Sequence, residues 1–136
     1  MRASATFEVE AFTPVDPPVD TGVETGCTVA VVRMVKRYEG GVAGRSTTVF
    51  TYALDDDTNI GAYVAMESFE GSLDGRTGTL NFSHSATTNG DDRSNESFRI
   101  VPASGTGELS GITGSGGISV EADGTHRLWF DYQIPS

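Results

Sequence analysis

An acidic side chain and an imidazole, Glu67 and His84, are predicted to meet across a β-hairpin. The dipeptide Asp74-Gly75 separates two alternating segments, which is the strongest short-range signal for a two-residue type I′ turn. This turn fixes the register and places Glu67 opposite Phe82 and Ala65 opposite His84. Diagonal positions lie about 7–8 Å apart at the backbone, within reach of both side chains. A carboxylate beside an imidazole can act as general acid and base, so we predict Glu67 and His84 as catalytic residues.

The hairpin face that carries this pair is otherwise apolar and aromatic, whereas the opposite face is mostly polar. The pair is therefore expected to point into the protein. Burying an unpaired carboxylate is unfavourable, so such a group must be paired, protonated or in contact with a wet cavity. Because desolvation favours the neutral acid, we expect a raised pKa for Glu67, with His84 as its proton partner near neutral pH.

Three other interpretations of the pair are open. Glu67 and His84 can form a satisfied polar pair inside a filled core, or a register error can place one of them on the outer surface. A metal site would add His126, which shares the phase of the aromatic residues of the last strand, because two histidines and a carboxylate can bind iron or zinc. The chain has only 2 histidines and no short-spaced ligand motif, so we expect neither a metal nor a cofactor.

Aromatic residues on the inner phase of several strands are predicted to line a cavity around the pair. The predicted ligand-binding residues are Tyr38, Tyr63, Phe69, Phe82, Phe98, His126 and Tyr132. The same alternation places Val9 and Glu96 inside. Segment 45–55 is apolar on both faces, which suggests a subunit contact, as do the outward-facing Trp129 and Met66. We therefore expect a homodimer or small homo-oligomer.

These side chains must be positioned by strands, because the chain has the period-2 pattern almost throughout and no helical stripe. Short connections rich in Gly, Asp and Asn join antiparallel neighbours, which predicts a closed eight-stranded antiparallel up-and-down β-barrel. A β-sandwich is the competing architecture, but it needs longer crossovers. A barrel of eight strands is just wide enough to be filled by side chains or to hold one small ligand. The predicted strands are 3–12, 28–39, 45–55, 60–73, 76–87, 94–102, 115–121 and 125–134.

Two irregular segments interrupt this pattern within a single domain of residues 1–136. Residues 13–26 contain three prolines and several acidic residues, which excludes both strand and helix. A loop of this length is either a lid or a disordered excursion. The glycine-rich segment 104–117 lacks the Gly-Lys-Ser/Thr of a phosphate loop and a following helix, so we expect turns and bulges at one end of the barrel.

The charge of the chain limits its partners. The 9 Lys and Arg residues against 19 Asp and Glu give a net charge of -10 at pH 7, so nucleic acid and anionic membrane surfaces are not expected partners. No apolar run approaches the roughly 20 residues of a membrane-spanning helix. The single cysteine, Cys27, cannot form an intrachain disulfide. These features predict a cytoplasmic protein, whereas the aromatic inner faces of the strands predict a small apolar molecule as its partner.

The segments 74–87 and 105–114, with Phe82-Ser-His-Ser85 and the closing strand from His126 to Tyr132, resemble those of an uncharacterised bacterial family of one-domain proteins. That family in turn resembles the allene oxide cyclase barrel, a calycin-type fold. The resemblance implies an oligomer and a fatty-acid-derived or polyketide-like ligand whose cyclisation or isomerisation is steered by cavity shape. The carboxylate of the plant cyclases belongs to an early strand and does not carry over, because Glu8 and Glu10 have outward phase here.

The leading functional hypothesis is an isomerase or cyclase that acts on a small hydrophobic metabolite inside the barrel. A shaped cavity can accelerate a unimolecular reaction by holding a reactive conformer, so few catalytic groups are needed. The alternative is a binding or carrier barrel without chemistry. A third possibility is a filled barrel that acts as an interaction module.

Overall fold

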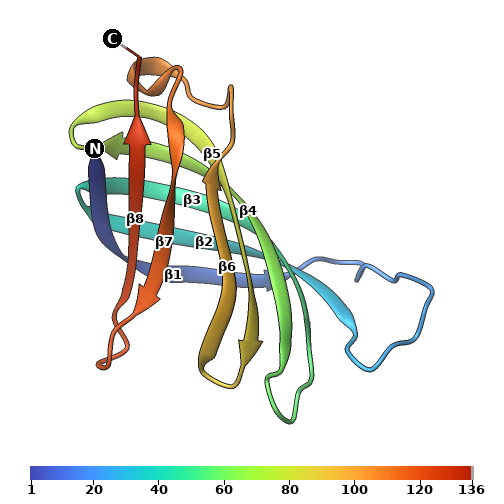
Figure 1. Ribbon diagram of the computed structural model, residues 1–136. Coiled ribbons are helices and arrows are strands. Elements are labelled where there is room, and N and C mark those ends of the chain that lie inside the picture. The colour runs from blue at the N-terminus through green and yellow to red at the C-terminus, as the bar shows by residue number, and fades with distance from the viewer. Residues whose placement is uncertain (136) are drawn as a thin grey trace.

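The computed structural model describes residues 1–135, which form eight β-strands and one short 3-10 turn, η1 (Figure 1). Each strand follows a segment of alternating inward and outward side chains, and each ends at a turn rich in Gly, Asp or Asn. The elements are β1 (Arg2–Pro14), β2 (Val29–Gly40), β3 (Val42–Leu54), β4 (Gly61–Leu73), β5 (Arg76–Asn89), β6 (Asp92–Ile100), η1 (Gly107–Leu109), β7 (Thr113–Val120) and β8 (His126–Gln133).

The strands form one closed sheet, which confirms the predicted eight-stranded antiparallel up-and-down barrel. Each strand pairs with the next one along the chain, and β1 also pairs with β8. The closure is uneven, because β6 and β7 share a single register pair, Arg99 with Ser115. The two strands diverge away from this pair (Figure 1). The barrel therefore has its weakest strand pairing between β6 and β7.

The β4–β5 hairpin has the predicted register. Asp74 and Gly75 both have positive φ, 49° and 86°, as the central residues of a type I′ turn require. Glu67 pairs with Phe82, and Ala65 pairs with His84. The turn residues thus determine which side chains share the inner face.

Two apolar clusters fill the barrel at different levels. The smaller one contains Tyr63, Ala65 and Ala86, with Phe50 and Tyr52 packed against it. The polar pair lies between the two clusters along β4 and β5. The larger cluster contains Ala3, Ala5, Phe7, Tyr38, Val42, Phe69, Leu73, Leu80, Phe82, Phe98, Ile100, Leu109, Ile112, Leu128, Phe130 and Tyr132.

Three glycines in register, Gly44, Gly71 and Gly78, cross β3, β4 and β5. Gly44 has a φ of 143°, which residues with a Cβ rarely adopt, and a Cβ there would overlap the backbone oxygen of Glu70. A Cβ on Gly78 would overlap the backbone oxygen of Thr106. These glycines therefore allow close backbone contact between neighbouring strands, and between β5 and the segment after β6.

Two predicted inner positions are wrong. Val9 is 45% exposed, because the pairing of β1 with β8 ends at Phe7 and leaves Val9 without a neighbour on that side. Glu96 is exposed because the β5–β6 register shifts by one residue near Asn95, whose φ is 53°. Such a β-bulge exchanges inward and outward positions on one strand.

Two predictions made from the sequence concern the surface of the barrel: a subunit contact at segment 45–55 and a lid formed by the loop after β1. In segment 45–55, Ser46 and Thr48 point inward, and outward Val49 lies beside exposed Met66 of β4. The subunit contact suggested for the outer face of this segment stays a prediction. The loop after β1 extends away from the barrel (Figure 1), and its role as a lid stays a prediction. Within residues 1–135, no helix has the length and apolarity needed to cross a lipid bilayer.

Candidate functional site

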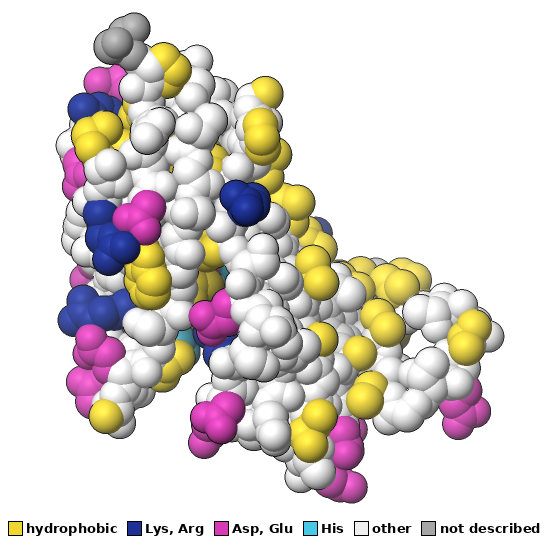
Figure 2. Space-filling view, viewed as in Figure 1, with side chains coloured by type: hydrophobic (Ala, Val, Ile, Leu, Met, Phe, Trp, Pro, Cys, Tyr) yellow, Lys and Arg dark blue, Asp and Glu magenta, His cyan; other side chains and the backbone are white. Residues whose placement is uncertain are grey.

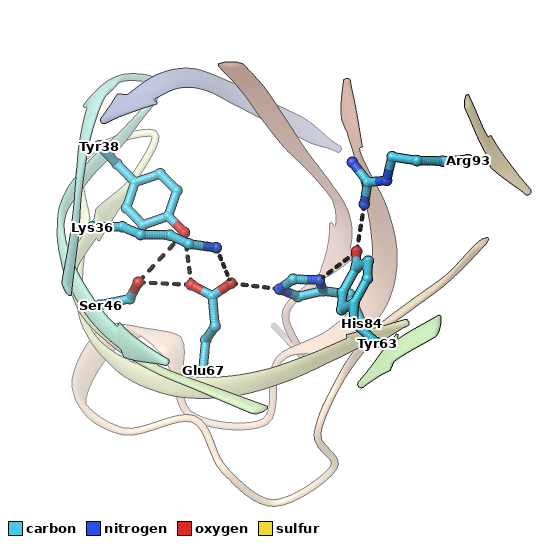
Figure 3. A network of polar contacts seen from close by, with 7 residues as sticks. All are labelled: Lys36, Tyr38, Ser46, Tyr63, Glu67, His84 and Arg93. Carbon is cyan, nitrogen blue, oxygen red and sulfur yellow. Dashed lines mark hydrogen bonds and ion pairs between the residues drawn. The ribbon is translucent and has the colours of Figure 1, made fainter. Parts of the chain in front are cut away.

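The carboxylate of Glu67 lies at the centre of a buried network of hydrogen bonds (Figure 3). Its Oε1 accepts hydrogen bonds from the hydroxyls of Tyr38 at 2.8 Å and Ser46 at 2.7 Å. Its Oε2 accepts from Lys36 Nζ at 2.7 Å and from His84 Nε2 at 2.5 Å. Glu67 is 0% exposed, and four donors from β2, β3 and β5 therefore replace the water that ionisation requires.

This network reverses the expected pKa shift of Glu67. Burial alone would raise the pKa of the carboxyl group, but the hydrogen bond from His84 and the positive charge of Lys36 outweigh it, so that the pKa is lowered. The expectation of a raised pKa is wrong because it considered desolvation without Lys36. Glu67 is a permanent anion at neutral pH.

The ionised carboxylate fixes the tautomer of His84. Because Glu67 carries no proton to donate, His84 Nε2 donates to it, and Nδ1 of the neutral ring accepts from the hydroxyl of Tyr63 at 3.0 Å. Burial lowers the pKa of His84, and the charges of Lys36 and Arg93 add to this effect although Glu67 opposes it. His84 is therefore held neutral and oriented, with one nitrogen available to take a proton from Tyr63.

Arg93 continues the chain of contacts on the far side of Tyr63 (Figure 3). Its Nη2 donates a hydrogen bond to the hydroxyl of Tyr63, and its guanidinium lies 5.4 Å from the centre of the Tyr63 ring. The β-bulge at Asn95 turns Arg93 inward, because Arg93 pairs with the inward position Thr88. Burial raises the pKa of Tyr63, and the nearby charge of Arg93 partly offsets this shift.

A cavity of about 170 Å³ adjoins this end of the network. It is lined by the inward residues Tyr63, His84 and Phe98 and by the outward residues Ser97 and Trp129, so it passes through the wall between β6 and β7. Figure 2 shows the molecule hollowed between the β7–β8 hairpin and β6. The contacts that begin at Glu67 thus end at this cavity.

The other predicted ligand-binding residues, apart from His126, belong to the larger cluster. Phe82 and Phe98 stack at 5.0 Å between ring centres, and each lies 5.9 Å from the ring of His84. Phe69 is buried in the larger cluster. So is Tyr132, whose hydroxyl donates to Asp74 at 2.7 Å, away from the cavity.

His126 lies at the rim of the barrel, where it is exposed and its ring packs 5.2 Å from that of Phe7. Among residues 1–135, no three His, Cys, Asp or Glu side chains are grouped so that they could hold a metal ion, and His126 does not join Glu67 and His84. The metal interpretation therefore has no geometric support in this part of the chain.

Three residues of the network were not predicted from the sequence: Lys36, Ser46 and Arg93. Lys36 has the same phase as Met34 and Tyr38 of β2, so alternation could have placed it inside. Ser46 lies on a strand whose two faces are both apolar in sequence, so alternation does not show which face points inward. Arg93 could not be found, because its orientation depends on a one-residue bulge that only the pairing of β5 with β6 reveals.

The stability of the protein is expected to decrease as the pH falls below 6.5, the ordinary value for an imidazole. Because the pKa of His84 is lowered in the folded state, the unfolded chain binds a proton that the folded chain does not, and acid favours unfolding. The lowered pKa of Glu67 gives a second decrease, with the same sign, below 4.5. Urea unfolding between pH 7 and pH 4 measures both.

The variant His84→Gln tests this assignment. Its free energy of unfolding should depend less steeply on pH between 6.5 and 5, by at most about 1.4 kcal/mol per pH unit. An identical slope in the wild type and the variant would contradict a role for His84 in the acid sensitivity.

Comparison with known proteins places the chain in a family. Residues 3–132 match the model of the family described as "Protein of unknown function (DUF3224)". A crystal structure at 1.84 Å of a DUF3224 protein of unknown function from Shewanella oneidensis MR-1 has 26% sequence identity and a TM-score of 0.85, and the alignment covers 100% of this chain and 98% of that one. No curated protein matches the chain significantly. The chain therefore belongs to the DUF3224 family of proteins of unknown function.

Proposed function

We propose that the protein is an isomerase that transfers a proton within a small, mostly hydrophobic carbonyl compound bound in the β6–β7 cavity. One observation carries the proposal: an unbroken series of polar contacts leads from the buried carboxylate of Glu67 through His84 to Tyr63, which borders the cavity. When these groups are hydrogen-bonded in this order, the carboxylate orients the imidazole, and the imidazole is the base that activates the hydroxyl group.

The residues have distinct roles in this proposal. Tyr63 is the group that exchanges a proton with the ligand, and His84 holds the proton that Tyr63 releases. Glu67 is enclosed by four donors and cannot reach a ligand, so it is a positioning residue rather than the acid or base itself. Arg93 places a positive charge beside the Tyr63 oxygen, which stabilises its anionic form.

The proton balance of the reaction closes without a cofactor. The Tyr63 oxygen takes a proton from a carbon next to the carbonyl group while its own proton moves to His84 Nδ1. The electron pair of the broken C–H bond forms the double bond of an enolate. Return of a proton at another atom restores Tyr63 and His84 and gives the isomer. A cyclisation of the allene oxide type would use the same cavity, but its ring closes by rearrangement of the ligand's own bonds and leaves no proton on Tyr63 or His84.

Hydrogen–deuterium exchange at enolisable carbons tests the proposal directly. Cyclohexanone and 2-oxobutyrate in D₂O, followed by ¹H NMR, are expected to exchange faster with the wild-type protein than with buffer at the same pD. In Tyr63→Phe the protein-dependent exchange rate should fall about 100-fold, because the proton-transferring group is gone.

Tyr52→Phe is the matched control, since Tyr52 packs against the same apolar cluster but has no contact with His84. Its exchange rate should equal that of the wild type. If neither compound exchanges above buffer although the wild type binds it, the protein is a carrier and the catalytic proposal is wrong. Equal losses in Tyr63→Phe and Tyr52→Phe would also contradict it.

A further inference from the structure

Arg93 is the one cationic side chain that lines the β6–β7 cavity in the described part of the chain. Its Nη2 donates to Tyr63, and its Nε forms an ion pair at 3.6 Å with Glu96, whose side chain is 49% exposed and also lines the cavity. Within residues 1–135, Nη1 has no hydrogen-bond partner. A guanidinium binds carboxylates through two parallel N–H groups, so Arg93 retains donor capacity for an anion that enters the cavity.

Two aromatic rings border the cavity. Phe98 stacks in line with Phe82 on the inner side, and Trp129 lies on the outer side. Gly116 and Gly117 form the β7 wall between them, and a Cβ on Gly117 would overlap the Trp129 ring. A Cβ on Gly116 would likewise meet the Phe98 ring, so both rings pack directly on β7 and border the cavity with aromatic surface, which suits a planar group.

The size of the cavity limits the ligand further. A volume of about 170 Å³ is close to the roughly 150 Å³ of an apolar protein cavity that binds benzene. One ring, or an acyclic group of similar size, would therefore fit it. The net charge of -10 over the whole chain makes a local cation necessary if an anion is to be held at all.

We propose that the cavity recognises a small planar carboxylate, with the carboxylate on Arg93 and the planar body against Phe98. This inference rests on the proposed function, because it names the substrate class of the same site. It also accounts for the position of Arg93, since a carboxylate held there brings the neighbouring carbon of the ligand towards the Tyr63 hydroxyl.

Binding of benzoate, benzamide and benzylamine tests the proposal. Trp129 is the only tryptophan of the chain and lines the cavity, so its fluorescence reports occupancy. The wild type is expected to bind benzoate at least tenfold more tightly than the isosteric neutral benzamide, and benzylamine more weakly still. In Arg93→Gln the affinity for benzoate should fall at least tenfold, while that for benzamide stays the same.

Arg99→Gln is the matched control, because it removes the same charge from the same strand at an exposed position outside the cavity. It should bind benzoate like the wild type. Arg93→Lys, which keeps the charge but not the paired donors, should have intermediate affinity and guards against misfolding of Arg93→Gln. Equal affinities for benzoate and benzamide, or equal losses in Arg93→Gln and Arg99→Gln, would overturn the inference.

The two proposals fail separately in these experiments. Benzoate has no enolisable hydrogen, so its binding is independent of catalysis. Arg93-dependent binding of benzoate without exchange of 2-oxobutyrate would leave a carboxylate carrier. Exchange of cyclohexanone without any preference for benzoate over benzamide would keep the isomerase and remove the carboxylate specificity.

Discussion

Glu67→Leu is expected to lower the free energy of unfolding by about 3–5 kcal/mol, because it leaves the ammonium group of Lys36 buried without its counter-ion. Lys36 is 3% exposed and lies 2.7 Å from the carboxylate, so it cannot turn to water while the barrel is intact. The loss also removes the acceptor of Tyr38 and Ser46. Urea unfolding at pH 7 measures the change.

The double variant Glu67→Leu/Lys36→Met separates the unpaired charge of Lys36 from the other losses. It removes the buried charge but leaves Tyr38, Ser46 and His84 without their acceptor, so it should recover part of the stability and be more stable than Glu67→Leu. Glu8→Leu, which breaks an exposed ion pair with Arg37, should change stability by less than about 1 kcal/mol. If the double variant is as unstable as Glu67→Leu, the unpaired charge is not the cause.

Gly44→Ala is expected to destabilise the fold by about 3 kcal/mol or more. The new methyl group would meet the backbone oxygen of Glu70 in the paired strand β4, which cannot move without disturbing the ladder. The φ of 143° adds strain for any residue with a Cβ. The shift of the urea midpoint, at constant slope, measures the loss of stability.

The same substitution at an open position is the control for this effect. Gly26 lies in the loop between β1 and β2, where a Cβ would have no neighbour within 4 Å. Gly26→Ala should therefore leave the midpoint nearly unchanged or raise it slightly. A similar loss at both positions would contradict the steric explanation.

The parts of the site that follow from local rules could be predicted from the sequence. Asp74-Gly75 favours a type I′ turn, and this turn determines every pairing of β4 with β5. Glu67 and His84 were therefore expected on one face. The structure places their side chains in contact. The eight strands and their order follow from alternation and short connections in the same way.

The rest depends on long-range pairing that no local pattern contains. Arg93 enters the barrel because β6 carries one extra residue relative to β5, which a period-2 reading of β6 cannot detect. The same bulge explains why Glu96 is outside. The direction of the pKa shift of Glu67 depends on Lys36 of β2, which lies 31 residues before Glu67 in the sequence.

The single register pair between β6 and β7 bears on how the proposed ligand would reach the interior. Where few backbone hydrogen bonds join two strands, local opening requires little free energy, and it can occur while the remainder of the structure stays folded. Widening at this seam would admit compounds bulkier than the resting space accommodates and would release them without unfolding. The selectivity of the barrel would then be determined partly by the breathing of its wall.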